Sequence, residues 1–156
     1  MVLKLILCCY MAICGGYFKM ENVKDCFNSA TQIKYICDGK TCTYQKGDDK
    51  YEIILSSLEK IMDGGYQMPA FAVSIDKLTR EELKSGNWIE FEFDSKTLEC
   101  NNMPFEALLI KVQSEYHGFN IIRKFNGKYE GRCFYFNLNG DMSQLFDTLK
   151  SLPTKN

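Results

Sequence analysis

The sequence NWIEFEFD at residues 87–94 decides the fold, because apolar and polar residues alternate along it almost without a break. Successive side chains of a β-strand point to opposite faces of a sheet, so this pattern predicts a strand with one buried face. Ile89, Phe91 and Phe93 would lie on that face. A strand of this kind needs partner strands from the rest of the chain.

Three further strands are predicted after this stretch, at residues 105–112, 117–125 and 131–138. The pair Asn126-Gly127 separates the last two and is typical of a tight hairpin turn. Strands joined by such short connections pair in the antiparallel direction. The second half of the chain therefore predicts an antiparallel sheet.

The first half predicts one hairpin and most of the helices. Residues 31–37 and 41–45 flank the turn pair Asp38-Gly39 and are predicted to form a hairpin. Helices are predicted at residues 22–30, 49–63, 76–84 and 141–150 from apolar residues at helical spacing. An apolar segment at residues 66–75 is predicted to be an edge strand, because Pro69 interrupts it.

These elements predict the fold class and the domain organisation. A chain of 156 residues suits one domain. We expect an α+β fold, with a curved, mainly antiparallel sheet and helices packed on one face. The single domain would span residues 20–152, and residues 153–156 would form a frayed tail.

Residues 1–19 are predicted to stand apart from the domain. Lys4 precedes an apolar run that ends at Gly15-Gly16, and a second methionine, Met20, follows. The segment fits an export signal, a stretch upstream of an alternative start at Met20, or an apolar element of the fold. A bilayer span needs about 20 apolar residues, so we expect no stable membrane insertion.

The cysteines favour a reducing compartment. Five of the eight lie outside the first 19 residues, at Cys26, Cys37, Cys42, Cys100 and Cys133. An odd number does not suit a complete disulfide framework, so we expect a cytoplasmic protein. The alternative is a secreted protein in which Cys37 and Cys42 face each other across the hairpin and form a disulfide.

The charge balance bears on the class of partner. The chain has 19 basic and 20 acidic residues, for a net charge of −1. Proteins that bind nucleic acid usually neutralise phosphates with an excess of basic residues. We therefore expect no nucleic-acid partner.

Glu90, Glu92 and Asp94 form the first candidate site, an acidic cluster on one face of the predicted strand. Carboxylates in a row can bind a divalent cation or carry out acid–base chemistry. The simpler interpretation is that they form the solvated face of a half-buried strand. We follow the simpler interpretation and predict no metal site, no catalytic residue and no cofactor.

His117 is the only histidine and could act as a general base, because its pKa lies near neutrality. No nucleophile motif or second metal-binding histidine accompanies it. A small metal-dependent or acid–base hydrolase using Glu90, Glu92 and His117 is therefore our third functional hypothesis. We expect His117 to be a loop residue without a chemical role.

The second candidate site lies at residues 119–136, where basic and aromatic residues are densest. Arg123 and Arg132 could hold an acidic ligand, and Tyr135 could lie beside them on an adjacent strand. Strands also carry aromatic and basic residues for structural reasons alone. We take Arg123, Arg132 and Tyr135 as candidate residues for binding a ligand or a partner.

Several phrases resemble an uncharacterised family of small proteins from Gram-positive anaerobic bacteria. They are NSATQIKYI at residues 28–36, MPA followed by VS at 68–74, MPF at 103–105 and GKYEGRCFY at 127–135. The resemblance covers nearly the whole chain from Met20 onward. It implies a cytosolic bacterial protein and brings no activity, cofactor or site residue with it.

The sequence thus predicts a non-enzymatic binding protein that uses its sheet to bind another protein or a small ligand. The alternative is a secreted interaction protein with a cleaved signal peptide, and the hydrolase is the third hypothesis. An enzyme needs Glu90, Glu92 and His117 to converge in one pocket. A binding protein needs an exposed apolar or cationic surface near Arg123, Arg132 and Tyr135.

Overall fold

The computed structural model describes residues 18–20, 22–63, 65–70, 75–94, 98–115 and 117–152. The side chains of residues 18–20, 117, 131 and 132 are not described. In chain order, the elements are β1 (Phe18–Met20), α2 (Val23–Asn28), β2 (Gln32–Cys37), β3 (Lys40–Gln45), α3 (Asp49–Met62), α4 (Asp76–Glu82), β4 (Asn87–Glu92), β5 (Leu98–Cys100), β6 (Met103–Phe105), β7 (Ala107–Val112), β8 (His117–Phe125), β9 (Lys128–Asp141) and α5 (Ser143–Ser151).

The main sheet of the described chain has six strands in the order β3-β2-β4-β7-β8-β9, and all neighbours are antiparallel. The stretch at 87–92 forms β4, which lies between β2 and β7. Both predicted hairpins are present. Asp38-Gly39 and Asn126-Gly127 adopt positive φ at both turn positions, as a tight hairpin turn requires. The predicted α+β fold with a mainly antiparallel sheet is confirmed.

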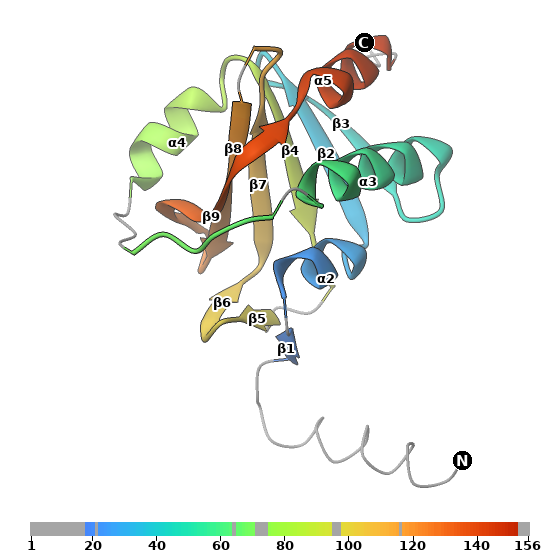
Figure 1. Ribbon diagram of the computed structural model, residues 1–156. Helices are drawn as coiled ribbons and strands as arrows, with labels where there is room; N and C mark the ends of the chain where they lie inside the picture. The colour runs from blue at the N-terminus through green and yellow to red at the C-terminus, as the bar shows by residue number, and fades with distance from the viewer. Residues whose placement is uncertain are drawn as a thin grey trace, which may run out of the picture.

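One face of this sheet packs against α2, α3 and α5 and forms the main core (Figure 1). Ile89 and Phe91 of β4 contribute from the sheet, as the alternation predicts. Tyr51, Ile54 and Leu58 contribute from α3 and are fully buried. Ile53, the residue before Ile54 in α3, is 45% exposed. The face of α3 that packs against the core is therefore the one that carries Ile54 and Leu58.

The opposite face of the sheet is partly covered by α4 (Figure 1). A second buried cluster lies there, formed by Trp88, Leu109, Ile122 and Tyr129. The Trp88 indole N–H donates to the carbonyl oxygens of Glu82 and Ser85 at the end of α4, at 3.1 and 3.0 Å. Helices α2, α3 and α5 thus pack on one face of the sheet, as predicted. Helix α4 lies on the opposite face, where the hydrogen bonds from Trp88 hold its C-terminal end.

A small sheet in the order β1-β5-β6 lies at one end of the domain. Phe18 and Lys19, which the prediction placed before the domain, pair with Leu98 and Glu99 of β5 in the parallel direction. Residues 1–17 and 153–156 lie outside the described residues, so the predicted signal-like segment and frayed tail are not described. Residues 71–74 of the predicted strand at 66–75 lie outside the described residues, and its described part forms one bridge, between Gln67 and Phe136.

Candidate functional site

A pocket of about 390 Å³ lies between α4 and strands β4, β7 and β8. We call it the α4 pocket. Its lining includes Thr79 and Glu82 of α4, Trp88 of β4, Lys111 of β7, and Asn120 and Ile122 of β8. Small-molecule sites in proteins occupy roughly 300–1,000 Å³ and combine apolar walls with a few polar groups. The α4 pocket has both properties.

The apolar part of the α4 pocket is formed by buried side chains. Trp88 is 1% exposed, and its indole is fixed by two hydrogen bonds to the end of α4. Ile122 lies on a neighbouring strand and packs in the same cluster as Trp88. Because these side chains are held by the sheet and by α4, a ligand would meet a preformed surface.

The polar part of the α4 pocket offers unused hydrogen-bonding groups. Gln113 and Asn120 line it, and both side chains are half-buried. Within the described part of the chain, neither carboxamide makes a side-chain hydrogen bond. Each carboxamide has donor hydrogens and an acceptor oxygen. A ligand in this pocket could therefore be held by complementary donors and acceptors.

The charges beside the α4 pocket compensate each other. The Lys111 ammonium lies 3.5 Å from the Glu82 carboxylate and 5.3 Å from the centre of the Trp88 ring. The ion pair and the cation–π contact place the Lys111 ammonium beside Glu82 and Trp88 in the pocket wall. The pocket therefore presents little net charge to a ligand.

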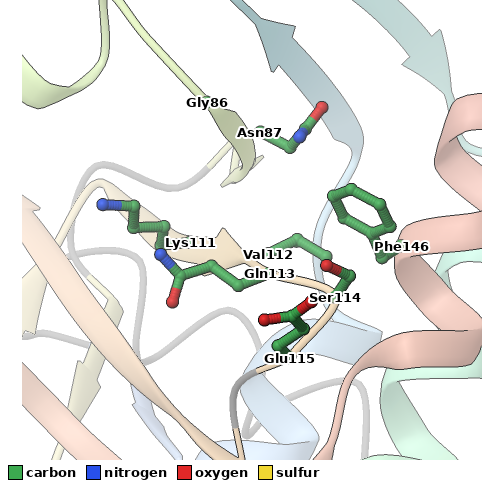
Figure 2. Close-up of a pocket in the computed structure, with 8 residues that line it drawn as sticks. All are labelled: Gly86, Asn87, Lys111, Val112, Gln113, Ser114, Glu115 and Phe146. Atoms are coloured by element: carbon green, nitrogen blue, oxygen red, sulfur yellow. The ribbon is translucent and has the colours of Figure 1, made fainter.

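A second opening of about 420 Å³ adjoins the α4 pocket and shares Lys111 and Gln113 with it. Figure 2 shows Phe146 of α5 on one side of this opening and Lys111 on the other. Asn87, at the start of β4, also lines it. The two openings together extend the accessible surface from α4 to α5.

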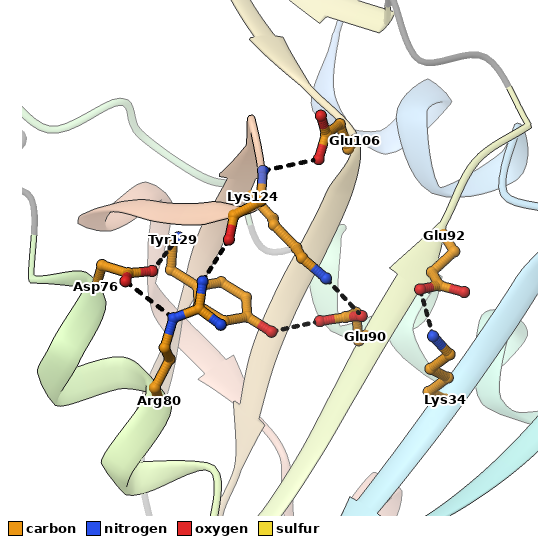
Figure 3. A network of polar contacts seen from close by, with 9 residues as sticks. Lys34, Asp76, Arg80, Glu90, Glu92, Glu106, Lys124 and Tyr129 are labelled. Atoms are coloured by element: carbon orange, nitrogen blue, oxygen red, sulfur yellow. Dashed lines mark hydrogen bonds and ion pairs between the residues drawn. The ribbon is translucent and has the colours of Figure 1, made fainter.

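A charged cluster lies next to the α4 pocket on the same face of the sheet (Figure 3). Glu90 follows Trp88 on this face of β4, and Lys124 follows Ile122 on β8. Glu90 is 3% exposed. Its carboxylate accepts a hydrogen bond of 2.7 Å from the Tyr129 hydroxyl and lies 3.6 Å from the Lys124 ammonium. We call Glu90, Lys124 and Tyr129 the Glu90 cluster.

Contacts from α4 complete the cover over this cluster (Figure 3). Asp76 accepts hydrogen bonds from the Tyr129 backbone N–H at 2.7 Å and from Arg80 Nε at 2.9 Å. Arg80 also donates to the Gly127 carbonyl oxygen. The pKa of Asp76 is lowered, chiefly by the hydrogen bond from Arg80 and then by that from Tyr129. Asp76 and Arg80 thus tie α4 to the β8–β9 hairpin.

Tyr129 is a fixed hydrogen-bond donor in the Glu90 cluster. Burial raises the pKa of its hydroxyl, and the neighbouring Glu90 carboxylate raises the pKa further. The hydroxyl therefore stays protonated at neutral pH and donates a hydrogen bond to the Glu90 carboxylate. A hydroxyl in this state does not serve as a general base.

The three predicted acidic residues do not form one site. Glu90 is buried in the Glu90 cluster, Glu92 pairs with Lys34, and the Asp94 carboxylate accepts a hydrogen bond of 3.1 Å from the Thr31 hydroxyl. The interpretation as a solvated face is wrong for Glu90, because α4 and Tyr129 cover that part of the strand. Among the described residues, no group of acidic, histidine and cysteine side chains could hold a metal ion.

His117 is separated from Glu90 by the strand register. Glu90 pairs with Leu109, and Leu109 pairs with Ile122 of β8. His117 begins β8, five positions before Ile122, and each strand residue advances the chain by about 3.3 Å. The histidine side chain itself lies outside the described part of the structure. The register does not place His117 beside Glu90, as the hydrolase hypothesis needs.

Arg123 and Tyr135 are engaged inside the protein rather than on an exposed surface. Arg123 pairs with Glu130 and donates a hydrogen bond of 2.7 Å to the Pro104 carbonyl oxygen. Tyr135 is 3% exposed, and its hydroxyl contacts Cys100 and Asn101. The Arg132 side chain lies outside the described part of the chain. The two described residues do not form the cationic patch that the binding prediction needs.

Cys37 and Cys42 are not opposed across the hairpin. The register of β2 and β3 pairs Cys37 with Lys40 and Cys42 with Tyr35. The two cysteines are therefore diagonal neighbours, and both are free thiols in the structure.

The α4 pocket is not among the predicted sites, although one signal for it is present in the sequence. Trp88 shares its face of β4 with Glu90 and Glu92, because the three residues are two positions apart. A tryptophan on a face taken to be solvated indicates that another element covers it. The predicted helix at residues 76–84 was the nearest element in the sequence that could do so.

Comparisons of this chain with protein-family models, with curated proteins and with solved structures return no match. Among the described helices, none has the length and apolar character to cross a bilayer.

Proposed function

We propose that this protein is a non-enzymatic binding protein and that it holds a small ligand in the α4 pocket. The observation that carries the proposal is a pocket of about 390 Å³ with a buried apolar wall and two carboxamides that have no partner among the described residues. Unpaired polar groups at the wall of a preformed pocket gain hydrogen bonds when a matching ligand enters.

The chemistry of the α4 pocket indicates the class of ligand. The Lys111–Glu82 ion pair balances the local charge, which favours a neutral molecule. The carboxamides of Gln113 and Asn120 match an amide or lactam edge, where a donor lies next to an acceptor. Trp88 and Ile122 suit an apolar or planar body. A neutral small molecule with an amide edge combines these features.

The ionisable side chains of the candidate residues support binding without catalysis, because they are engaged in contacts within the protein. Glu90, Glu92, Asp94 and Arg123 each have a partner within the protein. A general acid or base must reach the substrate with a proton to give or a free lone pair. The carboxylates of this face are occupied by structural contacts instead. A cytoplasmic location and the absence of a nucleic-acid partner stay predictions from the sequence.

Tryptophan fluorescence tests the proposal directly, because Trp88 is the only tryptophan in the chain. We expect a saturable change in its emission on titration with uridine, which carries a lactam edge, or with N-acetylalanine amide, which carries a peptide amide. The response of one probe but not the other identifies the type of amide that the pocket takes. A folded protein whose emission responds to neither probe would contradict the proposal.

Replacement of Asn120 by leucine should weaken the binding of the responding probe about tenfold, because the ligand loses hydrogen bonds that it had exchanged for water. The matched control is Gln144→Leu, which removes an exposed carboxamide on α5 outside the α4 pocket. The control should bind the probe like the wild type. Equal losses in the two variants would show that the probe binds elsewhere.

A further inference from the structure

β3 forms one edge of the main sheet, and its outer side has no partner strand among the described residues (Figure 1). The opposite edge, β9, receives a bridge from Gln67, whose backbone exchanges hydrogen bonds of 2.8 and 2.9 Å with Phe136. Native proteins usually protect an exposed edge strand by a cover, a proline or charged side chains. After Lys40, β3 carries neither a proline nor a charge. Its edge is therefore open to pairing with another chain.

The backbone groups of Thr41 and Thr43 point outward from this edge. Cys37 and Lys40 close the two-residue turn of the hairpin, and the residues of such a closing pair exchange hydrogen bonds. Bonding alternates along an antiparallel strand, so Lys40 and every second residue after it bond to β2. The N–H and carbonyl groups of Thr41 and Thr43 have no hydrogen-bond partner in the described part of the chain. We call residues 41–43 the free edge.

The free edge is bounded on both sides. Gln45 also faces outward, but its N–H donates to the Asp48 carboxylate at 2.8 Å and its carbonyl oxygen accepts from the Asp48 N–H at 3.0 Å. Gly39, at the other end, belongs to the turn and has a φ of +77°. A partner strand therefore finds its donors and acceptors at Thr41 and Thr43.

A pocket of about 520 Å³ adjoins the free edge, between β3 and the start of α3. We call it the β3 pocket. Tyr44 lines it, and the Tyr44 hydroxyl is buried without a hydrogen-bond partner among the described residues. Asp48 and Asp49 also line it, together with Lys50. Two carboxylates against one ammonium leave the lining negative, which favours a cationic side chain.

Lys40, at the start of β3, supplies such a cation. Its side chain is exposed and makes no ion pair with the described residues. β3 thus has a free ammonium at one end and a negative pocket at the other. In an antiparallel pair of two identical strands, the start of each strand lies beside the end of the other. The charges of β3 are therefore complementary to those of a second copy of β3.

We propose that β3 pairs with β3 of a second copy of the chain in the antiparallel direction, so that two six-stranded sheets become continuous. Thr41 lies opposite the partner's Thr43, and the free backbone groups of both strands make four hydrogen bonds. A register shifted by two residues would place a threonine opposite Gln45, which Asp48 already occupies, or opposite Gly39 of the turn. The free groups therefore define one two-fold register.

This register also fills the β3 pocket. Lys40 lies opposite the partner's Tyr44, and opposed side chains share one face of a sheet with β-carbons about 4.5–5.5 Å apart. The lysine stem then directs the ammonium into the partner's β3 pocket. There the ammonium can donate to the tyrosine hydroxyl oxygen, lie against the ring and pair with a carboxylate. Two-fold symmetry makes this contact twice.

Sedimentation equilibrium of the full chain under reducing conditions tests the proposal. We expect the mass to rise with concentration from 18.0 kDa to twice this value. Thr43→Pro should remain a monomer, because proline removes the outward N–H and its ring occupies the place of the partner strand. The bonds between β2 and β3 stay intact in this variant. A single-chain mass for the wild type up to about 1 mM, or a Thr43→Pro dimer, would overturn the proposal.

A charge swap tests the contact between Lys40 and the partner's β3 pocket. Lys40→Glu should raise the dimer dissociation constant about tenfold, because the new carboxylate would face Asp48 and Asp49. Asp49→Lys should weaken the dimer as well, and the double variant should recover most of the affinity. Lys77→Glu is the matched control, since it reverses an exposed lysine on α4, on the other face of the sheet. A double variant weaker than both single variants would contradict the assigned contact.

Cys42 tests the register, because the two-fold axis places it opposite the partner's Cys42. Such a pair makes no backbone hydrogen bonds, and its Cα atoms lie about 4.5 Å apart, which suits a disulfide. Diamide takes two electrons and two protons from the two thiols and becomes the hydrazine. After the remaining thiols are blocked with N-ethylmaleimide, tryptic digestion without reduction should give two linked copies of peptide 41–46, which dithiothreitol separates.

Cys42→Ser should lack this linked species and still sediment as a dimer. The internal control is Cys37, which is a diagonal neighbour of Cys42 within one chain. Peptide 35–40 linked to peptide 41–46, in a sample that sediments as a dimer and gives no linked pair of peptide 41–46, would show that the two copies associate through another surface. That result would overturn the proposal.

Discussion

Gly118→Ala is expected to destabilise the protein by about 4 kcal/mol, which is close to the upper end for a single substitution. Gly118 has a φ of +98°, a conformation that residues with a β-carbon rarely adopt. A β-carbon at this position would also overlap the carbonyl oxygen of Asn137 on β9. Relief of the overlap requires movement of the paired strands themselves. Urea unfolding of the variant measures the loss.

Gly47→Ala is the matched control for this prediction. Gly47 has nearly the same φ, +95°, but a β-carbon there would meet nothing within 4 Å. The control therefore carries the backbone strain without the overlap and should cost about 1–2 kcal/mol. If the two variants lose the same free energy of unfolding, the overlap with Asn137 is not the cause.

The position of Gly118 explains the size of the expected effect. The β8–β9 register shifts between His117 and Phe119, so the strands are bulged at this point. Phe119, the next residue, is 1% exposed and belongs to the main core. Asn120 follows on the opposite face and lines the α4 pocket. A displaced bulge would therefore disturb the core and the candidate site together.

The backbone of the fold could be predicted because its signals are local. Turn pairs with positive φ, at Asp38-Gly39 and Asn126-Gly127, mark the two predicted hairpins in the sequence. The alternation at residues 87–94 identifies the buried face of β4, and Ile89 and Phe91 occupy it. Strand order and the position of α4 also depend on contacts between distant residues, such as the hydrogen bond from the Tyr129 backbone N–H to Asp76.

The candidate site was harder to predict, because alternation along one strand shows two faces but not what covers each face. Glu90 and Glu92 have the same pattern in the sequence, yet the Glu90 side chain is 4% exposed and that of Glu92 is 29% exposed. The difference comes from α4 and from Tyr129, and Tyr129 lies far from Glu90 in the chain.

Bulges limited the prediction for the second candidate site. Tyr135 pairs with Ile121, but the β8–β9 register shifts between Ile121 and Arg123. Spacing along the sequence therefore does not give the relative positions of Arg123 and Tyr135. The buried tyrosine contacts Cys100, whereas the arginine pairs with Glu130.

The second large effect is expected for Lys124→Met, which should destabilise the protein by about 2–3 kcal/mol. The substitution keeps much of the apolar stem and removes the ammonium group 3.6 Å from Glu90. Glu90 would then remain buried with the Tyr129 hydroxyl as its described partner. A buried carboxylate that loses its counter-charge keeps the free-energy cost of its desolvation without the ion pair that offset this cost. Urea unfolding at neutral pH measures the change.

Glu90→Gln in the Lys124→Met background tests this cause, since the carboxamide is neutral and can still accept from Tyr129. The double variant should be more stable than Lys124→Met alone by about 1 kcal/mol. Lys34→Met provides the matched control, because Lys34 pairs with Glu92 two positions along the same strand face, where both side chains are about one-third exposed. That loss should stay below about 1 kcal/mol. Equal losses for Lys34→Met and Lys124→Met would mean that burial of Glu90 does not set the strength of its ion pair.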